Sequence, residues 1–225
     1  METNRFFRLL FTVICLFMMS ACASYGPPEN GVLAGDEKRL STNANRANKI
    51  VLEVPSGDVR INATHGSQIN ANLEIRCDTN NGNCLRLAER VKLEEALIDN
   101  VLYIRPTERS RYAFRHAQTD YRIDVPANTP LKINMGFGAL RVAGLRNELI
   151  IDMSAGDIDV EMARSEVRTV WADANFGDAQ LVGAEGGGSE RRLLVGAEAD
   201  WRDGKGAHDI IVNLGAGDIT VTLTE

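Results

Sequence analysis

The chain has 225 residues, of which 25 are Lys or Arg and 31 are Asp or Glu, so its formal net charge is −6 at pH 7. This acidic balance argues against nucleic acid as a partner, because nucleic-acid-binding proteins present basic surfaces. The chain is rich in glycine (20 residues) and poor in aromatic residues (6%), a composition that suits short strands stacked closely together.

The N-terminus has the pattern of a secretory signal peptide that ends at residue 21. Arg5 and Arg8 supply positive charge, and residues 9–19 are apolar apart from Thr12. A run of this length is too short to cross a bilayer as a helix, so a cleaved signal is favoured over a membrane-anchor helix.

Residues 19–22 read Met-Ser-Ala-Cys and resemble a bacterial lipobox. The resemblance implies cleavage before Cys22 and attachment of a diacylglycerol to its thiol, which would make the mature chain a lipoprotein. Ala23 and Ser24 follow without an aspartate. By resemblance to Gram-negative lipoproteins, this implies a place in the cell envelope at the outer membrane, facing the periplasm. The alternative is an ordinary signal peptide cut nearby, with Cys22 incidental.

Residues 22–48 are expected to form a lipidated tether that holds a domain away from the membrane. Residues 24–31 contain two adjacent prolines and two glycines, and residues 43–48 are polar without a period. Such segments favour irregular structure, and a flexible leash suits a lipid-anchored domain.

Residues 49–225 are predicted to form one repetitive β domain, or two joined subregions at 49–119 and 120–225. A ten-residue pattern occurs five times, at 52–61, 133–142, 151–160, 172–181 and 212–221. Each copy alternates apolar and polar residues on both sides of a central glycine, which predicts two half-buried strands joined at a corner. The corner residues are Gly57, Gly138, Gly156, Gly177 and Gly217. The repetition predicts an all-β fold, either a β-solenoid or a repetitive β-sandwich, with about 20 residues in each coil.

One interval departs from the spacing of the repeat. Gly177 and Gly217 are 40 residues apart, which predicts a further, degenerate copy around residues 193–199, after a flexible insert at 183–189.

The segment between the first and second copies has elements of its own. Residues 70–76 alternate apolar and polar residues, which predicts a strand, and residues 85–90 are expected to form at most a short helical turn. A pair of strands is predicted on either side of Asp99-Asn100.

A disulfide is predicted between Cys77 and Cys84, which enclose a polar loop that contains a glycine. Cysteines at this spacing pair readily in an oxidising compartment. A metal site is the alternative, but no histidine or third cysteine lies nearby in the sequence to complete a set of ligands.

Residues 121–126 (YRIDVP), then 131–133 (LKI) and the run of Gly-Asp copies, resemble the bacterial adhesin-like domain of unknown function. The resemblance covers roughly residues 50–225 and is best after residue 120. It implies a β-solenoid-like fold and a role at the cell surface, and it supplies no catalytic residue and no cofactor.

Four arginines between residues 105 and 115 are interleaved with Tyr112 and Phe114, and only Glu108 opposes them. The four are Arg105, Arg109, Arg111 and Arg115. Guanidinium groups beside aromatic rings suit the phosphates or carboxylates of envelope polymers, so this segment is a candidate anion-binding loop. The alternative is a solvated loop between two strands.

The aspartates that follow the corner glycines raise the question of a calcium site, but aspartate beside glycine is ordinary turn chemistry and no metal is expected. These aspartates are Asp58, Asp157, Asp178 and Asp218. The favoured function is a non-enzymatic envelope lipoprotein that presents a β surface to an envelope polymer or a partner protein. A polysaccharide-acting enzyme is the alternative. It needs charged side chains that converge in a cleft, and Asp157 and Asp159 are expected on opposite faces of their strand.

Overall fold

The structure is a computed structural model that describes residues 31–184, 186, 188–192, 196–202 and 204–225. The predicted signal peptide, Cys22 and the first part of the predicted tether lie outside the described residues. The described chain forms one sheet of 16 strands that includes both halves of the predicted domain, since β9 (Leu131–Leu145) pairs with β3 (Lys49–Ser56) and with β4 (Asp58–Thr64). The all-β repetitive fold is therefore confirmed.

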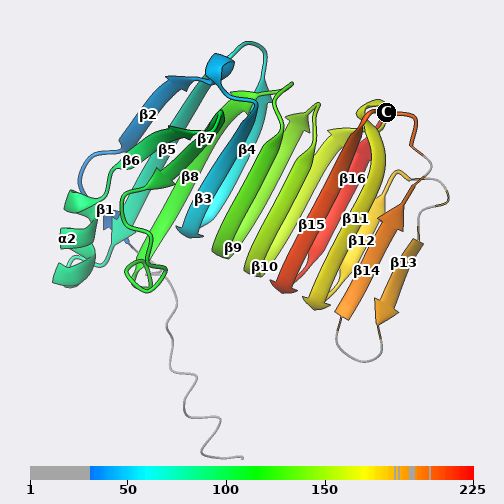
Figure 1. The fold of residues 1–225 in the computed structure, drawn as a ribbon. Coiled ribbons are helices and arrows are strands. Elements are labelled where there is room, and N and C mark those ends of the chain that lie inside the picture. Colours follow the sequence, from blue (N-terminus) through cyan, green and yellow to red (C-terminus); the bar gives the residue numbers. More distant parts are fainter. Residues whose placement is uncertain (1–30, 185, 187, 193–195, 203) are drawn as a thin grey trace, which may run out of the picture.

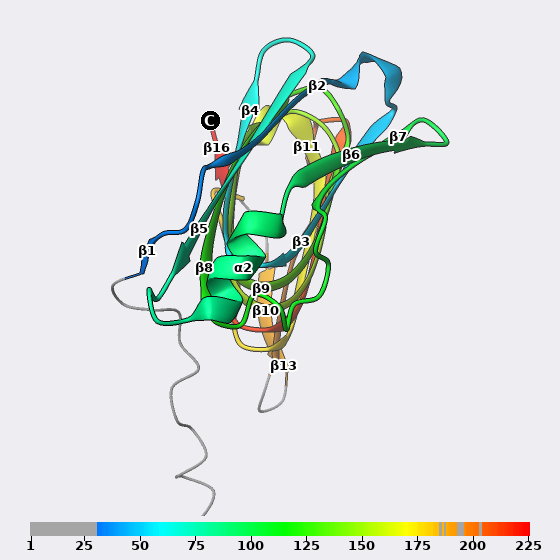
Figure 2. The same ribbon diagram turned by 90° about the vertical axis from the view of Figure 1, so that its left-hand side faces the viewer.

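Each coil consists of two layers joined by a bend, which Figure 2 shows by looking along the row of coils. β9 and β10 (Leu149–Ala163) each pass through the bend as a single strand, whereas β3 and β4 divide there. The same division separates β11 (Val167–Phe176) from β12 (Ala179–Val182), and β15 (His208–Ala216) from β16 (Ile219–Thr224). The corners form the lower edge of the sheet in Figure 1.

The coils pair in parallel and in register, so that equivalent positions of the repeat form rows across the strands. One inner row contains Leu52, Ile133, Ile151, Val212 and Ala172, in that spatial order. All five are fully buried. The alternating pattern thus supplies a continuous apolar core between the two layers, as the sequence predicts.

Glycine is required at the corners because the backbone there is left-handed and the coils touch. The five corner glycines have φ angles between 128° and 132°. A Cβ atom on Gly156 would lie 1.8 Å from the carbonyl oxygen of Gly138, and one on Gly138 would lie 1.9 Å from that of Gly57. A side chain at these positions would therefore collide with the backbone of the neighbouring coil.

The coils do not stack in sequence order. β15 and β16 lie beside β10, and β11 and β12 lie beyond them. The 40-residue spacing is explained by β13 (Gly188–Arg192) and β14 (Gly196–Trp201), which form an antiparallel pair. β14 pairs antiparallel with β11, and β13 is the last strand on this side of the sheet. The prediction of another coil around 193–199 was wrong, because antiparallel strands finish the sheet there; residues 193–195 themselves lie outside the described residues.

The other end of the row is closed by antiparallel strands and one helix. β6 (Leu93–Ile98) and β7 (Val101–Pro106) form the predicted hairpin, with positive φ at Asp99 and Asn100. β8 (Ala117–Pro126) pairs with β4, and β5 (Gln68–Cys77) pairs with β8. The helix α2 (Gly82–Arg90) is longer than the predicted short turn, and it buries Cys84, Leu87 and Ala88 against the end of the core.

The tether prediction is wrong for its second half. β1 (Val32–Leu33) and β2 (Lys38–Asn43) pair antiparallel with β5, and a 3₁₀ helix, Ala44–Arg46, follows. β2 alternates half-buried and exposed residues, which is a weak sequence pattern for a strand. It forms a strand because the edge of β5 offers unpaired backbone N–H and C=O groups to it.

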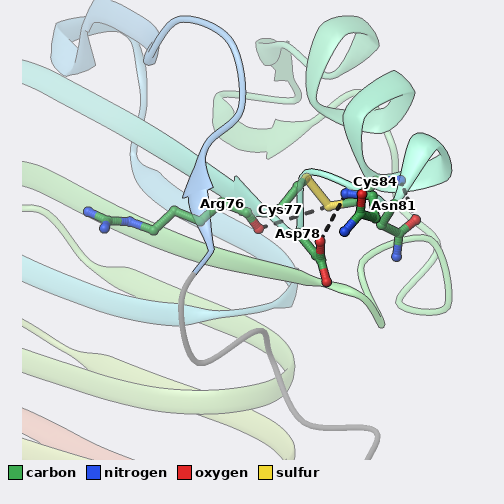
Figure 3. The surroundings of a disulfide bond; sticks show 6 residues. Arg76, Cys77, Asp78, Asn81 and Cys84 are labelled. Carbon is green, nitrogen blue, oxygen red and sulfur yellow. Dashed lines mark hydrogen bonds between the residues drawn. A yellow bond between two sulfur atoms is a disulfide. The ribbon is translucent and has the colours of Figure 1, made fainter.

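The structure contains the predicted disulfide, which Figure 3 shows at the end of β5. The Cα atoms of Cys77 and Cys84 are 5.7 Å apart, within the usual range for a disulfide. The side chain of Asn81 caps α2 by accepting a hydrogen bond from the Cys84 N–H at 3.1 Å. The disulfide therefore holds the first turn of the helix against the end of the sheet.

Candidate functional site

The segment 107–116 connects β7 to β8 and folds back against the corners of β3 and β9. It appears in Figure 1 as the green loop at the lower left. Phe114 is 1% exposed and attaches the loop to the core. Glu108 is the single acidic residue of the loop. Its carboxylate accepts a hydrogen bond from the Ser110 N–H at 2.8 Å, so it binds the backbone of the loop itself. We call residues 107–116 the arginine loop.

The four predicted arginines fall into two groups. Arg105 lies on β7, where its guanidinium contacts Glu53 at 3.2 Å and Glu94 at 2.8 Å. Arg109 contacts the same Glu94 at 3.4 Å. The hydrogen bond from Arg105 lowers the pKa of the Glu94 carboxyl. Arg105 is therefore paired with acids of two neighbouring strands and is not part of an exposed arginine cluster. Arg109 only shares Glu94 with Arg105, and its side chain stays 60% exposed.

Arg111 and Arg115 remain without a carboxylate partner among the described residues. The guanidinium of Arg111 lies over the rings of Tyr112 and Phe137, at 5.5 Å and 5.2 Å from their centroids. Arg115 donates a hydrogen bond from Nε to Nε2 of His116 at 3.1 Å. These two cations are exposed on a chain of net negative charge, which makes them the better candidates for binding an anion.

A groove of about 590 Å³ separates the arginine loop from the corners, and we call it the arginine-loop groove. Its lining contains Arg111, Tyr112, Phe114, Arg115, Phe137, Thr119 and the corner residues Ser56, Gly57, Asp58 and Gly138. Thr119 is buried and donates its hydroxyl to the carbonyl oxygen of Ser56 at 2.7 Å. The site therefore combines two guanidinium groups that have no carboxylate partner among the described residues, two accessible aromatic rings and the carboxylate of Asp58.

Sequence reasoning missed the contribution of Phe137. It occupies the position before the corner glycine, where the other copies of the repeat have Ser56, Ala155, Phe176 and Ala216. Phe137 is 41% exposed. An aromatic residue at a spacer position that is small in three of the five copies is the signal that could have indicated a surface role.

A second groove, of about 570 Å³, lies on the outer face formed by β4, β9, β10 and β16, and we call it the aspartate-arginine groove. Its charged lining is Asp58, Arg60, Arg141, Asp157, Asp159 and Asp218. Asp157 and Asp159 line the same groove, so the prediction of opposite faces was wrong. β10 continues through the bend at Gly156, so residues two apart after it share a face.

The aspartates of this groove have structural contacts of their own. Asp58 accepts a hydrogen bond from the Ala139 N–H at 3.3 Å, and Asp218 accepts one from the Asp178 N–H at 3.0 Å. Each of these carboxylates thus caps the corner of the neighbouring coil. Asp159 contacts Arg141 at 3.6 Å. The turn chemistry expected of aspartate beside glycine therefore acts between coils at these two corners, not within one.

Within the described residues no group of three or more His, Cys, Asp or Glu side chains is arranged to hold a metal ion. In the same part of the chain no helix is both long and apolar enough to cross a membrane.

The comparisons with known proteins agree with this architecture. The family model Toastrack DUF4097 matches residues 29–222. The structure of a proposed cell adhesion protein from Clostridium sporogenes is 14% identical and has a TM-score of 0.52, and the match covers 84% of this chain and 99% of that one. A proposed adhesin from Bacteroides fragilis is also 14% identical, with 85% and 78% covered, but its TM-score is 0.25. No match was found among curated proteins. Because the family model covers most of the sequence, the chain belongs to the Toastrack DUF4097 family of unknown function.

Proposed function

We propose that the protein is a non-enzymatic cell-envelope lipoprotein, anchored by a lipid on Cys22 at the outer membrane and facing the periplasm. It presents its repetitive β surface to an envelope polymer or a partner protein, and it binds an anionic group of the envelope in the arginine-loop groove. The similarity in fold to a proposed cell adhesion protein supports a binding role.

One observation carries the choice of site. Arg111 and Arg115 are the arginines of the loop that have no carboxylate partner in the described structure, and they lie in a groove beside Tyr112 and Phe137. A phosphate or carboxylate would receive charge-assisted hydrogen bonds from both guanidinium groups. The rigid aromatic rings beside them would limit the entropy lost on binding.

Charge reversal tests the site. Replacing Arg109, Arg111 and Arg115 by Glu should abolish retention on an anionic polymer and leave thermal stability unchanged, because exposed loop charges contribute little to folding. Retention should also weaken with salt, since exposed charges are screened over ~8 Å at physiological ionic strength. Arg146→Glu is the matched control, an exposed arginine between β9 and β10 at the opposite edge. Retention indifferent to both the reversal and salt would show that the loop is merely solvated.

The anchor and the partner need separate experiments. Cys22→Ser should move the protein from the membrane fraction to the soluble fraction or leave it as an uncleaved precursor, whereas unchanged fractionation would refute lipidation. Capture from envelope extracts with the wild-type chain and the triple-Glu variant then identifies what depends on the loop.

A polysaccharide-acting enzyme is the second candidate, favoured by the charged groups that line the aspartate-arginine groove. Glycoside hydrolases use paired carboxylates on one face, and Asp157 and Asp159 are such a pair. The assay is release of reducing ends from acidic polysaccharides, which Asp159→Asn should abolish if the protein is a hydrolase. The binding role is preferred because Asp58, Asp218 and Asp159 already have the structural contacts described above.

A further inference from the structure

We infer that the arginine loop docks on the anionic phospholipid headgroups of the membrane that carries the lipid anchor. The inference deepens the proposed function and rests on its anchor at Cys22.

The first observation is that the start of the described chain lies close to the arginine loop. Val32 pairs with Cys77, and Cys77 pairs with Ala117, the residue that follows the arginine loop. Two strand spacings amount to about 10 Å. The described chain therefore begins close beside the end of the loop.

The length of chain before that point limits how far the loop can be from the membrane. Residues 23–31 separate the proposed lipidation site from β1. Even fully extended, such a segment spans only about 30 Å. The tether thus keeps the loop at a high effective concentration next to the membrane surface, so that even a weak contact between the two would be occupied. A soluble polymer would have to compete with that surface.

The side chains at this end suit a membrane surface. Tyr112 is 69% exposed, and Val32 and Leu33 are 49% and 52% exposed. Val32 lies two strands away from Ala117, the residue after the arginine loop. Aromatic and cationic side chains together are typical of the water–bilayer interface. Each arginine near an anionic surface adds roughly fivefold in affinity, so Arg111 and Arg115, which have no carboxylate partner, add roughly 25-fold together. The nearby Asp78 accepts a hydrogen bond from the Asn80 N–H at 2.9 Å but keeps its charge, so it weakens this attraction, as does Asp58 in the lining of the groove.

The charge along the corner edge gives the docking an orientation. Beyond the arginine loop the corners present Asp157, Asp218 and Asp178, all exposed, in neighbouring coils. An anionic membrane attracts the loop end and repels this acidic row. The row of coils is then tilted away from the membrane, with the aspartate-arginine groove turned toward the periplasm and available to a partner.

The experiment uses the full lipidated chain in vesicles, with a thiol-reactive, environment-sensitive fluorophore on Tyr112→Cys. The introduced cysteine is the reactive thiol, since Cys77 and Cys84 form the disulfide. In vesicles that contain phosphatidylglycerol the emission should shift to the blue and be quenched by headgroup-attached quenchers. In pure phosphatidylcholine neither should occur. His65→Cys, an exposed position beyond the far end of β4, is the matched control and should report water in both vesicles.

Replacing Arg109, Arg111 and Arg115 by Gln should remove the shift at position 112, as should high salt, while the protein stays on the vesicles. An anchored protein whose label reports water on both kinds of vesicle would overturn the docking and leave the anchor intact. A shift produced by soluble polyphosphate on neutral vesicles, with none from phosphatidylglycerol, would assign the loop to a polymer instead. A wild-type chain that does not remain with vesicles would overturn the anchor, and the docking with it.

Discussion

We expect Gly156→Ala, at one of the corner glycines, to be severely destabilising, although it adds only one methyl group at a surface turn. The backbone of Gly156 has φ 129°, a conformation nearly restricted to glycine, which costs any other residue of order 1–3 kcal/mol. The new Cβ atom would lie 1.8 Å from the carbonyl oxygen of Gly138 and 2.7 Å from Cε of Met153. The methionine end can move, but the carbonyl belongs to the backbone of β9.

The close approach adds a second cost. Real Cβ contacts are not shorter than 3.0 Å, so β9 and β10 would have to separate by more than an ångström at the corner. That lengthens ladder hydrogen bonds beyond the range in which they are effective, at about 1–3 kcal/mol for each buried group left without a partner. Together the two costs come to roughly 2–6 kcal/mol, a large share of the total stability of a typical domain.

Urea unfolding followed by circular dichroism measures the change in the free energy of unfolding. Gly66→Ala is the matched control, because Gly66 also has a positive φ, 108°, but has no atom within 4 Å of the position its Cβ would take. It should lose only the conformational part, of order 1–3 kcal/mol. Equal losses for the two variants would refute the argument that coil-to-coil contact excludes side chains from the corners.

Three further predictions concern the core and its edges. Tyr121→Phe should raise the free energy of unfolding by about 1 kcal/mol, because the buried phenol oxygen has no hydrogen-bond partner among the described residues; a loss of stability in thermal melts would contradict this. Reduction of the Cys77–Cys84 disulfide should cost about 2.5 kcal/mol, and the double Cys→Ser variant should show no response to reductant in the same urea titration. Burial, and secondarily the charge of Asp58, raise the pKa of Asp120. Ionisation of Asp120 therefore opposes folding above that pKa, so Asp120→Asn should raise the free energy of unfolding at pH 7. This gain in stability should vanish as the pH falls below 3.8, the ordinary pKa of aspartate. A gain in stability that does not depend on pH would contradict this prediction.

The sequence predicted the coils well because one local pattern decides both layers and the bend. Ile151, Met153, Ile158 and Val160 alternate around Gly156, and each is at most 5% exposed. The order of the coils could not be predicted in the same way. Parallel coils with the same pattern can pair with any other such coil, so no local signal shows that β15 lies between β10 and β11.

The limits at the candidate site have a similar physical cause. Arg105 and Arg111 look equivalent in the sequence, but Arg105 lies on β7 opposite acids of neighbouring strands, whereas Arg111 lies in the loop. Pairing between strands is non-local, so only the fold shows which arginine is neutralised. The strand at Lys38–Asn43 was missed for the same reason, since its partner β5 follows much later in the chain.

The insertion of β15 and β16 into the middle of the row has a consequence for how the chain can assemble. In most repeat proteins each new unit adds to the outside of the last, and folding can spread from one neighbour to the next. Here β11 and β12 are synthesised first, yet their parallel partners are residues 208–224. Until residues 208–224 have been synthesised, the coil of β11 and β12, which carries the β13–β14 hairpin, has no parallel partner strand. Deletion of residues 208–224 would therefore remove the strand that is the parallel partner of both β10 and β11, so we expect the domain to assemble as one unit.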